Sequence, residues 1–313
     1  MSSNVCGVHS IDHYALTVPS LAQARHFFES FGLDVEASDD QLNLSAADGL
    51  RWAKILPGAA KSLAYLSFNC YEHDFQRLRQ QVEELGARFV EGDGAGFWFH
   101  DLHGNLLQVK IGSKTMPDHK LDTTRVSVAG EMGGEGVRGV GTRDQVPRIK
   151  PARLSHVLLF SPDVPASIAF YEQALGLRLS DKSQDIIAFM HAPHGCDHHL
   201  VAFVKSSAKG WHHAAWEVQN IDQVGAGAFQ MAAAGYKDGW GTGRHSLGSN
   251  YFHYVRDPWG SFCEYSAEMD YIAEGMVWPT GDFQPENSLY LWGPDVPEYF
   301  ILNTETEASL LVE

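Results

Sequence analysis

Hydrophobic and polar positions repeat one strand and helix pattern in the two halves of the chain, with a period of about 145 residues. Residues 11–33 read as an apolar strand, IDHYALTV, and a helix, AQARHFFESF, and residues 154–177 repeat this order as LSHVLLFSPDVPASIAFYEQALGL. In the second copy Ile168, Tyr171 and Leu175 fall on one helical face, and Pro165 suits the first turn. We expect each half to begin with a strand that leads into an amphipathic helix.

A second strand and helix follow in each half. They read LAYLSFNC and DFQRLRQQVEELGA in the first half, and HHAAWEVQN and DQVGAGAFQMAAAGY in the second. Gly86 and Gly235 mark the left-handed ends of these helices. Each half then closes with strands around a glycine-containing turn, DLHGNLLQV from Asp101 and DPWGSFCEY from Asp257. The pattern therefore predicts a duplicated module.

This organisation predicts four segments: an N-terminal domain in residues 1–115, a glycine-rich linker in 116–149, a C-terminal domain in 150–270 and a tail in 271–313. The linker contains GEMGGEGVRGVGTRDQVP, which offers little that could be buried. The tail holds too many aromatic side chains to leave in water, so we expect it to pack on the C-terminal domain and to form part of a pocket wall. Its aromatic residues include Trp278, Phe283, Tyr290, Trp292, Tyr299 and Phe300.

Composition and charge exclude several classes of function. With 313 residues and 44% hydrophobic content, the chain can build cores of ordinary size and is expected to be a soluble globular protein. Its net charge of −16 disfavours nucleic acid and anionic lipid as partners. It has no apolar run near the roughly 20 residues that span a bilayer and no secretory signal, so the cytoplasm is the expected compartment. The four cysteines lack CxxC spacing and are expected to be reduced thiols.

Three positions of the repeat carry the candidate chemistry. When the two copies are aligned, His13 corresponds to His156, Tyr65 to His213, and Gln108 to Glu264. The first set cannot hold a divalent metal, whereas two imidazoles and one carboxylate form the facial triad of non-haem Fe(II) oxygenases. Such a site carries a net charge of about +1 and keeps open positions, which favours a chelating anionic substrate together with a second reactant.

Each of these residues also has a structural interpretation. A histidine in an apolar strand is more often satisfied by backbone hydrogen bonds, and the glutamate could pair with a surface cation. The metal hypothesis rests on their coincidence at equivalent strands of the repeat. Three further polar residues are candidates for the surroundings of the metal: His199, His245 and Tyr254, with His198 or His253 as alternatives to the two histidines. If the intervening turn has an odd number of residues, Tyr254 lies opposite Glu264 in a hairpin.

The segments SHVLLFSPD, GWHHAAWEV and GRHSLGSNYFHYVRDPWGSFCEY resemble motifs of the type I extradiol ring-cleaving dioxygenases, in the vicinal oxygen chelate superfamily. The resemblance covers roughly residues 8–270 and is most specific across residues 245–265. It implies an α+β fold of tandem βαβββ modules that form two incomplete barrels. It also implies a homo-oligomer with Fe(II), or alternatively Mn(II), in the C-terminal barrel.

The same resemblance assigns roles to the candidate residues. His156, His213 and Glu264 match the metal ligands, with His212 as the neighbour of the second ligand. His199 matches the histidine that transfers protons near bound oxygen. Tyr254 matches the tyrosine that hydrogen-bonds the substrate oxygen, and His245 matches the histidine that lines the substrate side. The sequence departs from the family in HHAAWEV, which has Ala and Trp after the ligand, and in CDHHL, which has an extra histidine. Both departures bear on the identity of the substrate.

The expected activity is extradiol cleavage of a catechol-type aromatic diol with O2, giving a muconic semialdehyde type product in aromatic compound catabolism. One alternative is a metal-dependent lyase or isomerase of the glyoxalase or epimerase kind. Such relatives draw ligands from both modules, whereas the first module here offers only His13, Tyr65 and Gln108. The other alternative is a metal-free protein that sequesters a small molecule, which would have no reason to align two histidines and a glutamate on matching strands.

Overall fold

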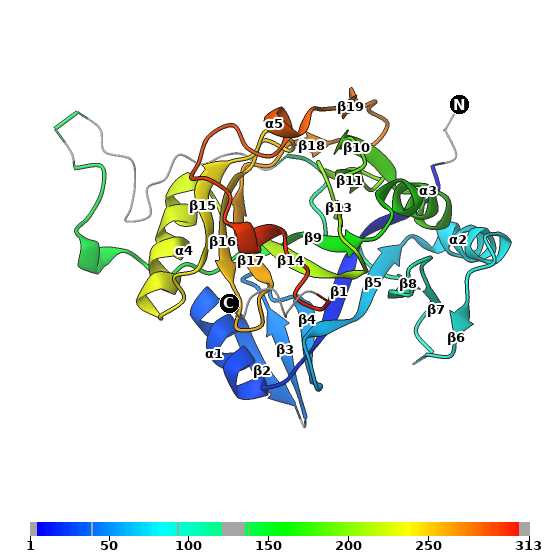
Figure 1. Ribbon diagram of the computed structural model, residues 1–313, viewed down its shortest axis with the longest axis horizontal. Helices are drawn as coiled ribbons and strands as arrows, with labels where there is room; N and C mark the ends of the chain where they lie inside the picture. The colour runs from blue at the N-terminus through cyan, green and yellow to red at the C-terminus, as the bar shows by residue number, and fades with distance from the viewer. Residues whose placement is uncertain (1–4, 39, 93, 121–134, 137, 307–313) are drawn as a thin grey trace.

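The computed structural model describes residues 5–38, 40–92, 94–120, 135–136 and 138–306, and in this part of the chain two curled mixed sheets are covered by helices (Figure 1). The expected α+β fold of two incomplete barrel domains is confirmed. The predicted linker falls partly outside the described residues, because positions 121–134 and 137 are not among them. The boundaries of the four predicted segments stay a prediction.

The first domain is built on an eight-stranded sheet with the order β2-β3-β4-β1-β5-β8-β7-β6. Its elements are β1 (Val8–Val18), α1 (Leu21–Phe31), β2 (Asp34–Ser38), β3 (Gln41–Ser45), β4 (Arg51–Pro57), β5 (Ser62–Cys70), α2 (Glu72–Glu84), β6 (Phe89–Val90), β7 (Phe97–His100) and β8 (Leu106–Ile111). A short 3-10 helix, η1 (Arg143–Gln145), lies between the two domains along the chain.

The second domain is built on a nine-stranded sheet with the order β15-β16-β17-β14-β9-β13-β11-β10-β19. Its elements are β9 (Arg153–Ser161), α3 (Val164–Leu175), β10 (Arg178–Ser183), β11 (Ile187–His191), β12 (Cys196–Asp197), β13 (Val201–Lys205), β14 (Gly210–Glu217), α4 (Ile221–Ala233), β15 (Gly239–Arg244), β16 (Tyr251–Arg256) and β17 (Phe262–Ala267). The tail adds β18 (Tyr271–Ile272), which pairs with β12, and then β19 (Gly281–Asp282), α5 (Pro285–Ser288) and η2 (Glu298–Ile301).

Each domain is itself a duplication. The first strand of a unit leads into a helix and then into three strands, of which the last pairs in parallel with the first, as β1 does with β4 and β5 with β8. The two units of a domain meet where their first strands pair antiparallel, β1 with β5 and β9 with β14. Four βαβββ units therefore make up the fold, and the two most central strands of each sheet are the first strands of its units.

The first helix of each domain has clear local determinants. Ser20 and Asp163 cap α1 and α3 by accepting backbone N–H bonds from Gln23 and Ala166. Each helix ends at a glycine with positive φ, Gly32 after α1 and Gly176 after α3. The predicted strand and helix order and these helix ends are confirmed. Aromatic and aliphatic residues on one face of α1 are fully buried and cover the sheet: Ala24, Phe27, Phe28 and Phe31.

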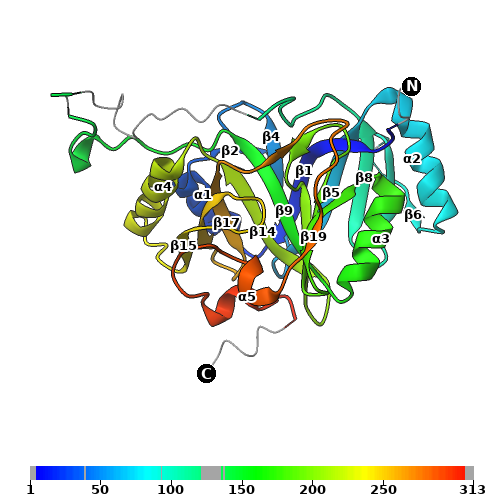
Figure 2. The ribbon, with the colours of Figure 1, turned by 90° about the horizontal axis from the view of Figure 1, so that it is seen from above.

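The domains are joined along an approximate twofold arrangement. Helix α1 contacts α4 at one end of the molecule and α2 contacts α3 at the other, as Figure 2 shows. The ring of Tyr265 stacks on Phe31 of the other domain with centroids 3.9 Å apart, and its hydroxyl donates to the Phe31 carbonyl at 2.7 Å. A Cβ at Gly32 would overlap the carbonyl oxygen of Ile149, and a Cβ at Gly176 would overlap that of Cys6. The end of each first helix therefore presses on the chain that enters the other domain.

The tail lies along the second sheet. Strand β19 extends β10 in parallel, and Phe300 is buried in a cluster with Trp240, Phe252, Tyr254 and Phe262. Phe283 and Trp292 stay 38% and 46% exposed, so only part of the aromatic content is covered. All four cysteines are free thiols, as predicted. Among the described residues, no helix has both the length and the apolar character needed to cross a bilayer.

The packing at Gly176 predicts a matched pair of stability effects. Gly176 and Gly86 both follow a helix with φ of 68°, but a Cβ at Gly86 would meet no atom within 4 Å. Gly86→Ala should cost about 1 kcal/mol, the penalty of left-handed backbone alone. Gly176→Ala should cost a further ~1–3 kcal/mol, because it forces the two domains apart locally. Urea unfolding of both variants measures the difference, and equal losses would contradict the packing role.

Candidate metal centre

Three adjacent strands of the second sheet carry the metal-ligand candidates. His156 lies on β9, His213 on β14 and Glu264 on β17, and these strands are neighbours in the order β17-β14-β9. Ala215 pairs with His156 on one side and with Glu264 on the other. His213 stands two residues before Ala215, so its side chain falls on the same face of the sheet. The three side chains converge because strand register places them in one patch.

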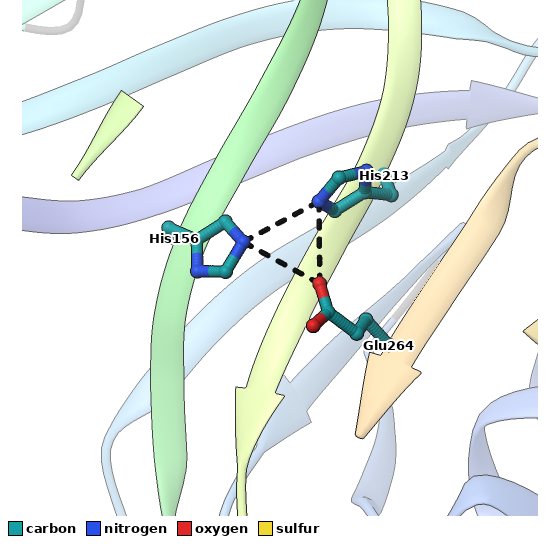
Figure 3. A group of neighbouring side chains, drawn as sticks. All are labelled: His156, His213 and Glu264. Carbon is teal, nitrogen blue, oxygen red and sulfur yellow. Dashed lines mark hydrogen bonds and ion pairs between the residues drawn. The ribbon is translucent and has the colours of Figure 1, made fainter. Parts of the chain in front are cut away.

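The ligand atoms form a nearly equilateral triangle (Figure 3). The Nε2 atoms of His156 and His213 lie 3.4 Å apart, and each lies 3.4 Å from Oε2 of Glu264. A point about 2 Å from all three atoms therefore exists, which matches usual metal–nitrogen and metal–oxygen distances. Glu264 is 0% exposed and its Oε2 has no hydrogen-bond partner. Since an unpartnered buried carboxylate oxygen is costly, the donor set fits a divalent cation.

Neighbouring groups orient each ligand. Asn250 donates from Nδ2 to Oε1 of Glu264 at 3.0 Å and to the Ser266 hydroxyl at 2.9 Å. Nδ1 of His213 lies 2.7 Å from Nδ1 of His212. Nδ1 of His156 lies 3.1 Å from the Ser155 hydroxyl. These contacts leave Nε2 of each imidazole and Oε2 of the carboxylate directed at the common centre.

Burial keeps the imidazoles in the neutral form that a metal requires. Desolvation, with the neighbouring histidines adding to it, lowers the pKa of His213 well below its usual range. The same two causes lower the pKa of His199 well below its usual range.

The equivalent positions of the first domain are closed by hydrogen bonds. Nε2 of His13 lies 2.8 Å from the Tyr65 hydroxyl, and Nδ1 of His13 bonds Asp12. The Ser67 hydroxyl donates to Oε1 of Gln108 at 2.7 Å. In the described part of the chain, the group formed by His156, His213 and Glu264 is the one cluster with metal-ligand geometry. The first copy keeps the fold but has replaced ionic ligands by neutral pairs.

A cavity of about 170 Å³ opens above the three ligands. Its walls are mainly apolar, and among the described residues that line it there is no lysine or arginine. The apolar walls come from the second sheet and from the tail: Leu158, Ile186, Ile187, Phe189, Val204, Leu247, Pro285, Leu289, Phe300 and Ile301. A small aromatic molecule can therefore reach the ligand triangle with little polar competition.

The further predicted residues line the same cavity. His199 stacks near His156 with ring centroids 4.1 Å apart. Nε2 of His245 lies 2.9 Å from the Tyr254 hydroxyl, and its Nδ1 donates to the Leu289 carbonyl of the tail at 2.6 Å. Strand register pairs Tyr254 with Glu264, which confirms the expected hairpin. Burial lowers the pKa of His245, and burial together with Glu264 raises the pKa of Tyr254 well above its usual range.

The two alternative histidines lie outside the cavity wall. His198 turns its Nε2 to Asp181 at 2.8 Å, and His253 contacts Thr242 in the β15–β16 pair. Sequence reasoning missed Asn250 and Asp181. The sequence signal for Asn250 is its place in the segment with the most specific resemblance. Asp181 has no such signal, because it contacts its partners from a separate strand.

Comparison with known proteins agrees with this geometry. Residues 153–265 match the glyoxalase/bleomycin resistance protein/dioxygenase superfamily. The chain is 60% identical over 302 residues to metapyrocatechase 2 of Cupriavidus necator, which covers 95% of this chain and 93% of that protein. It is 26% identical over 245 residues to an iron-dependent extradiol dioxygenase of Rhodococcus jostii (strain RHA1), covering 71% of this chain and 74% of that one.

Solved structures share the fold. A variant of homoprotocatechuate 2,3-dioxygenase from B. fuscum matches with a TM-score of 0.75 at 18% identity, covering 96% of this chain and 83% of that chain. A Mn(II)-bound glyoxalase from Novosphingobium aromaticivorans matches with a TM-score of 0.72 at 22% identity, covering 94% of each chain. At these identities the matches establish the arrangement of the strands.

The ligand triangle predicts the effect of removing its one charge. Glu264→Gln keeps the shape of the side chain but replaces the charged oxygen, so iron bound after anaerobic loading should fall from about one equivalent to nearly none. Metal analysis of the desalted protein measures this. His13→Ala, at the equivalent place in the first domain, is the control and should retain iron. Full iron content in Glu264→Gln, with native circular dichroism, would exclude the carboxylate as a ligand.

Proposed function

The chain belongs to the metapyrocatechase family of extradiol dioxygenases, and from this premise we propose that it opens the ring of a catechol-type diol with O2 beside one hydroxyl, in aromatic compound catabolism. The observation that carries the proposal is the bare Oε2 of Glu264, which faces two imidazole nitrogens at 3.4 Å on the floor of an apolar cavity. A site with this donor set and open positions is typical of enzymes that bind an organic substrate and O2 together.

We propose that His156, His213 and Glu264 hold Fe(II), as in an iron-dependent extradiol dioxygenase, with Mn(II) as the alternative. Bound there, the metal would chelate the two oxygens of the diol and pass electron density from the ring to O2. The remaining tasks, which are binding, orientation and proton transfer, belong to the residues of the cavity.

The cavity suits a single aromatic ring. Its volume of about 170 Å³ is close to the ~150 Å³ of an apolar protein cavity that binds benzene. Leu158, Phe189 and Leu247 form one apolar wall, and the tail residues Leu289 and Phe300 contribute another part of the lining. These walls exclude water from the ring and leave the polar corner beside the ligands for its two oxygens.

Two polar groups have distinct roles in the proposal. Tyr254 and His245, linked at 2.9 Å, hold the substrate oxygen by directed hydrogen bonds, and the Leu289 carbonyl keeps the His245 ring in place. His199 accepts a hydroxyl proton at its cavity-facing nitrogen and returns it later. Because its pKa is strongly lowered, the ring starts in the neutral form that can accept this proton.

The two alternative functions are less well supported. A lyase or isomerase that shares ligands between domains would need donors from the first domain, where His13, Tyr65 and Gln108 are engaged in hydrogen bonds. A metal-free sequestering protein leaves the buried Oε2 of Glu264 unexplained. Assembly into a homo-oligomer and location in the cytoplasm stay predictions from the sequence.

The activity and the role of His199 can be tested together. Protein loaded anaerobically with Fe(II) should consume O2 with catechol and form a yellow ring-opened product. His199→Gln should retain iron but lose about 100-fold or more in kcat, as is usual for an acid–base residue. His73→Gln, at a side chain that is 71% exposed, is the control. No O2 consumption by the iron-loaded protein would refute the activity, and an unchanged kcat in His199→Gln would refute the role.

The cavity lining predicts selection against charged ring substituents. Without a lysine or arginine in the described lining, a ring carboxylate would be buried unpaired. We expect 4-methylcatechol to exceed 3,4-dihydroxybenzoate, which has a similar size, by about 100-fold or more in kcat/KM. Steady-state rates with both compounds measure the ratio, and equal values would show that the carboxylate finds a partner.

A further inference from the structure

Two adjacent histidine pairs in the second domain share one hydrogen-bond arrangement. In the pair His212 and His213 the Nδ1 atoms lie 2.7 Å apart, and in the pair His198 and His199 they lie 3.1 Å apart. In both pairs the first histidine is anchored through Nε2, His212 on the carbonyl of Phe300 at 2.8 Å and His198 on the carboxylate of Asp181 at 2.8 Å. In both pairs the second histidine lines the cavity.

The ligand pair shows what this arrangement does. A carbonyl can only accept, so His212 must donate from Nε2, and its neutral ring then has a lone pair at Nδ1. Burial lowers the pKa of His212 to about 4, which keeps the ring neutral. His213 therefore donates from Nδ1 and keeps a lone pair at Nε2, the atom that faces His156 and Glu264. The first histidine fixes the tautomer of the second.

The same reasoning applies to the second pair, with Asp181 as the anchor. Oδ1 of Asp181 accepts from the Gly281 amide at 2.7 Å, and Oδ2 accepts from Nε1 of Trp278 at 3.0 Å and from His198. Each of these contacts requires Asp181 as an acceptor, so the proton of His198 lies on Nε2. Nδ1 of His198 can then only accept, and His199 must donate from Nδ1.

The surroundings hold His198 in this orientation. Its side chain is 0% exposed, its amide donates to the Asp270 carbonyl at 2.6 Å, and its carbonyl accepts from the Ser180 hydroxyl. Its ring packs against Phe189 on one side and Trp278 on the other. His198 can therefore neither leave the cluster nor turn its ring without breaking several contacts.

We propose that Asp181 and His198 are positioning residues that keep the His199 proton on Nδ1, so that Nε2 of His199 faces the diol as a hydrogen-bond acceptor. This inference rests on the proposed function and explains the extra histidine of the CDHHL segment. Trp278 and Gly281 bind the same carboxylate, so the tail helps to hold the anchor in place.

Substitutions at His198 separate a hydrogen-bonding role from a packing role. His198→Phe keeps a planar ring but removes both contacts, and kcat with catechol should fall about 10- to 100-fold while KM and iron content stay unchanged. His198→Gln supplies an amide that can donate to Asp181 and an oxygen that can accept from His199, so it should recover much of the loss. His253→Phe, the same change at a buried histidine outside the cavity, is the control and should keep wild-type kcat.

A second measurement does not depend on turnover. In zinc-loaded protein with 15N-labelled histidine, NMR shifts of the His199 ring, assigned with His199→Gln, should place the proton on Nδ1 in the wild type and shift it toward Nε2 in His198→Phe. A wild-type proton on Nε2, an unchanged kcat in His198→Phe, or equal losses in the Phe and Gln variants would overturn the proposal. An inactive iron-loaded wild type would instead refute the proposed function, and the NMR result would still decide this inference.

Discussion

A carboxylate oxygen buried without a partner is the constraint on which the rest of the second domain depends. Glu264 is fully inaccessible on a central strand, and its Oε2 faces two imidazole nitrogens that are neutral at ordinary pH. Burying an isolated negative charge costs several kcal/mol, so this arrangement is stable only when a cation completes it. The neighbouring groups satisfy every other donor and acceptor of the ligands, which leaves the three free atoms for one ion.

The tail is part of the site although it lies far from the ligands in sequence. The Phe300 carbonyl fixes His212, the Leu289 carbonyl fixes His245, and Trp278 and Gly281 fix Asp181. Backbone carbonyls and a carboxylate can only accept, so each of these contacts decides which ring nitrogen carries a proton. The tail therefore sets tautomers in the site as well as closing the wall of its cavity.

Duplication explains why a metal site of this kind is tolerated. The first domain keeps the same strand order and the same three positions but satisfies them with hydrogen bonds among His13, Tyr65, Ser67 and Gln108. Its folding does not depend on an ion. Packing of α1 on α4 and of α2 on α3 then gives the second domain a metal-independent partner surface. A functional site with a strained charge balance is thus carried on a scaffold that has its own stability.

The sequence by itself determined the repeat, the strands and helices of each unit, and the residue types of the ligand set, because hydrophobic periodicity and aligned positions are local properties. Its register argument also placed Tyr254 opposite Glu264. Only the tertiary structure decided which histidine of each adjacent pair reaches the cavity, and that Asn250, Asp181 and three tail segments orient the site. These contacts join residues up to 100 positions apart, and their identity depends on side-chain direction and strand order, which no local pattern encodes.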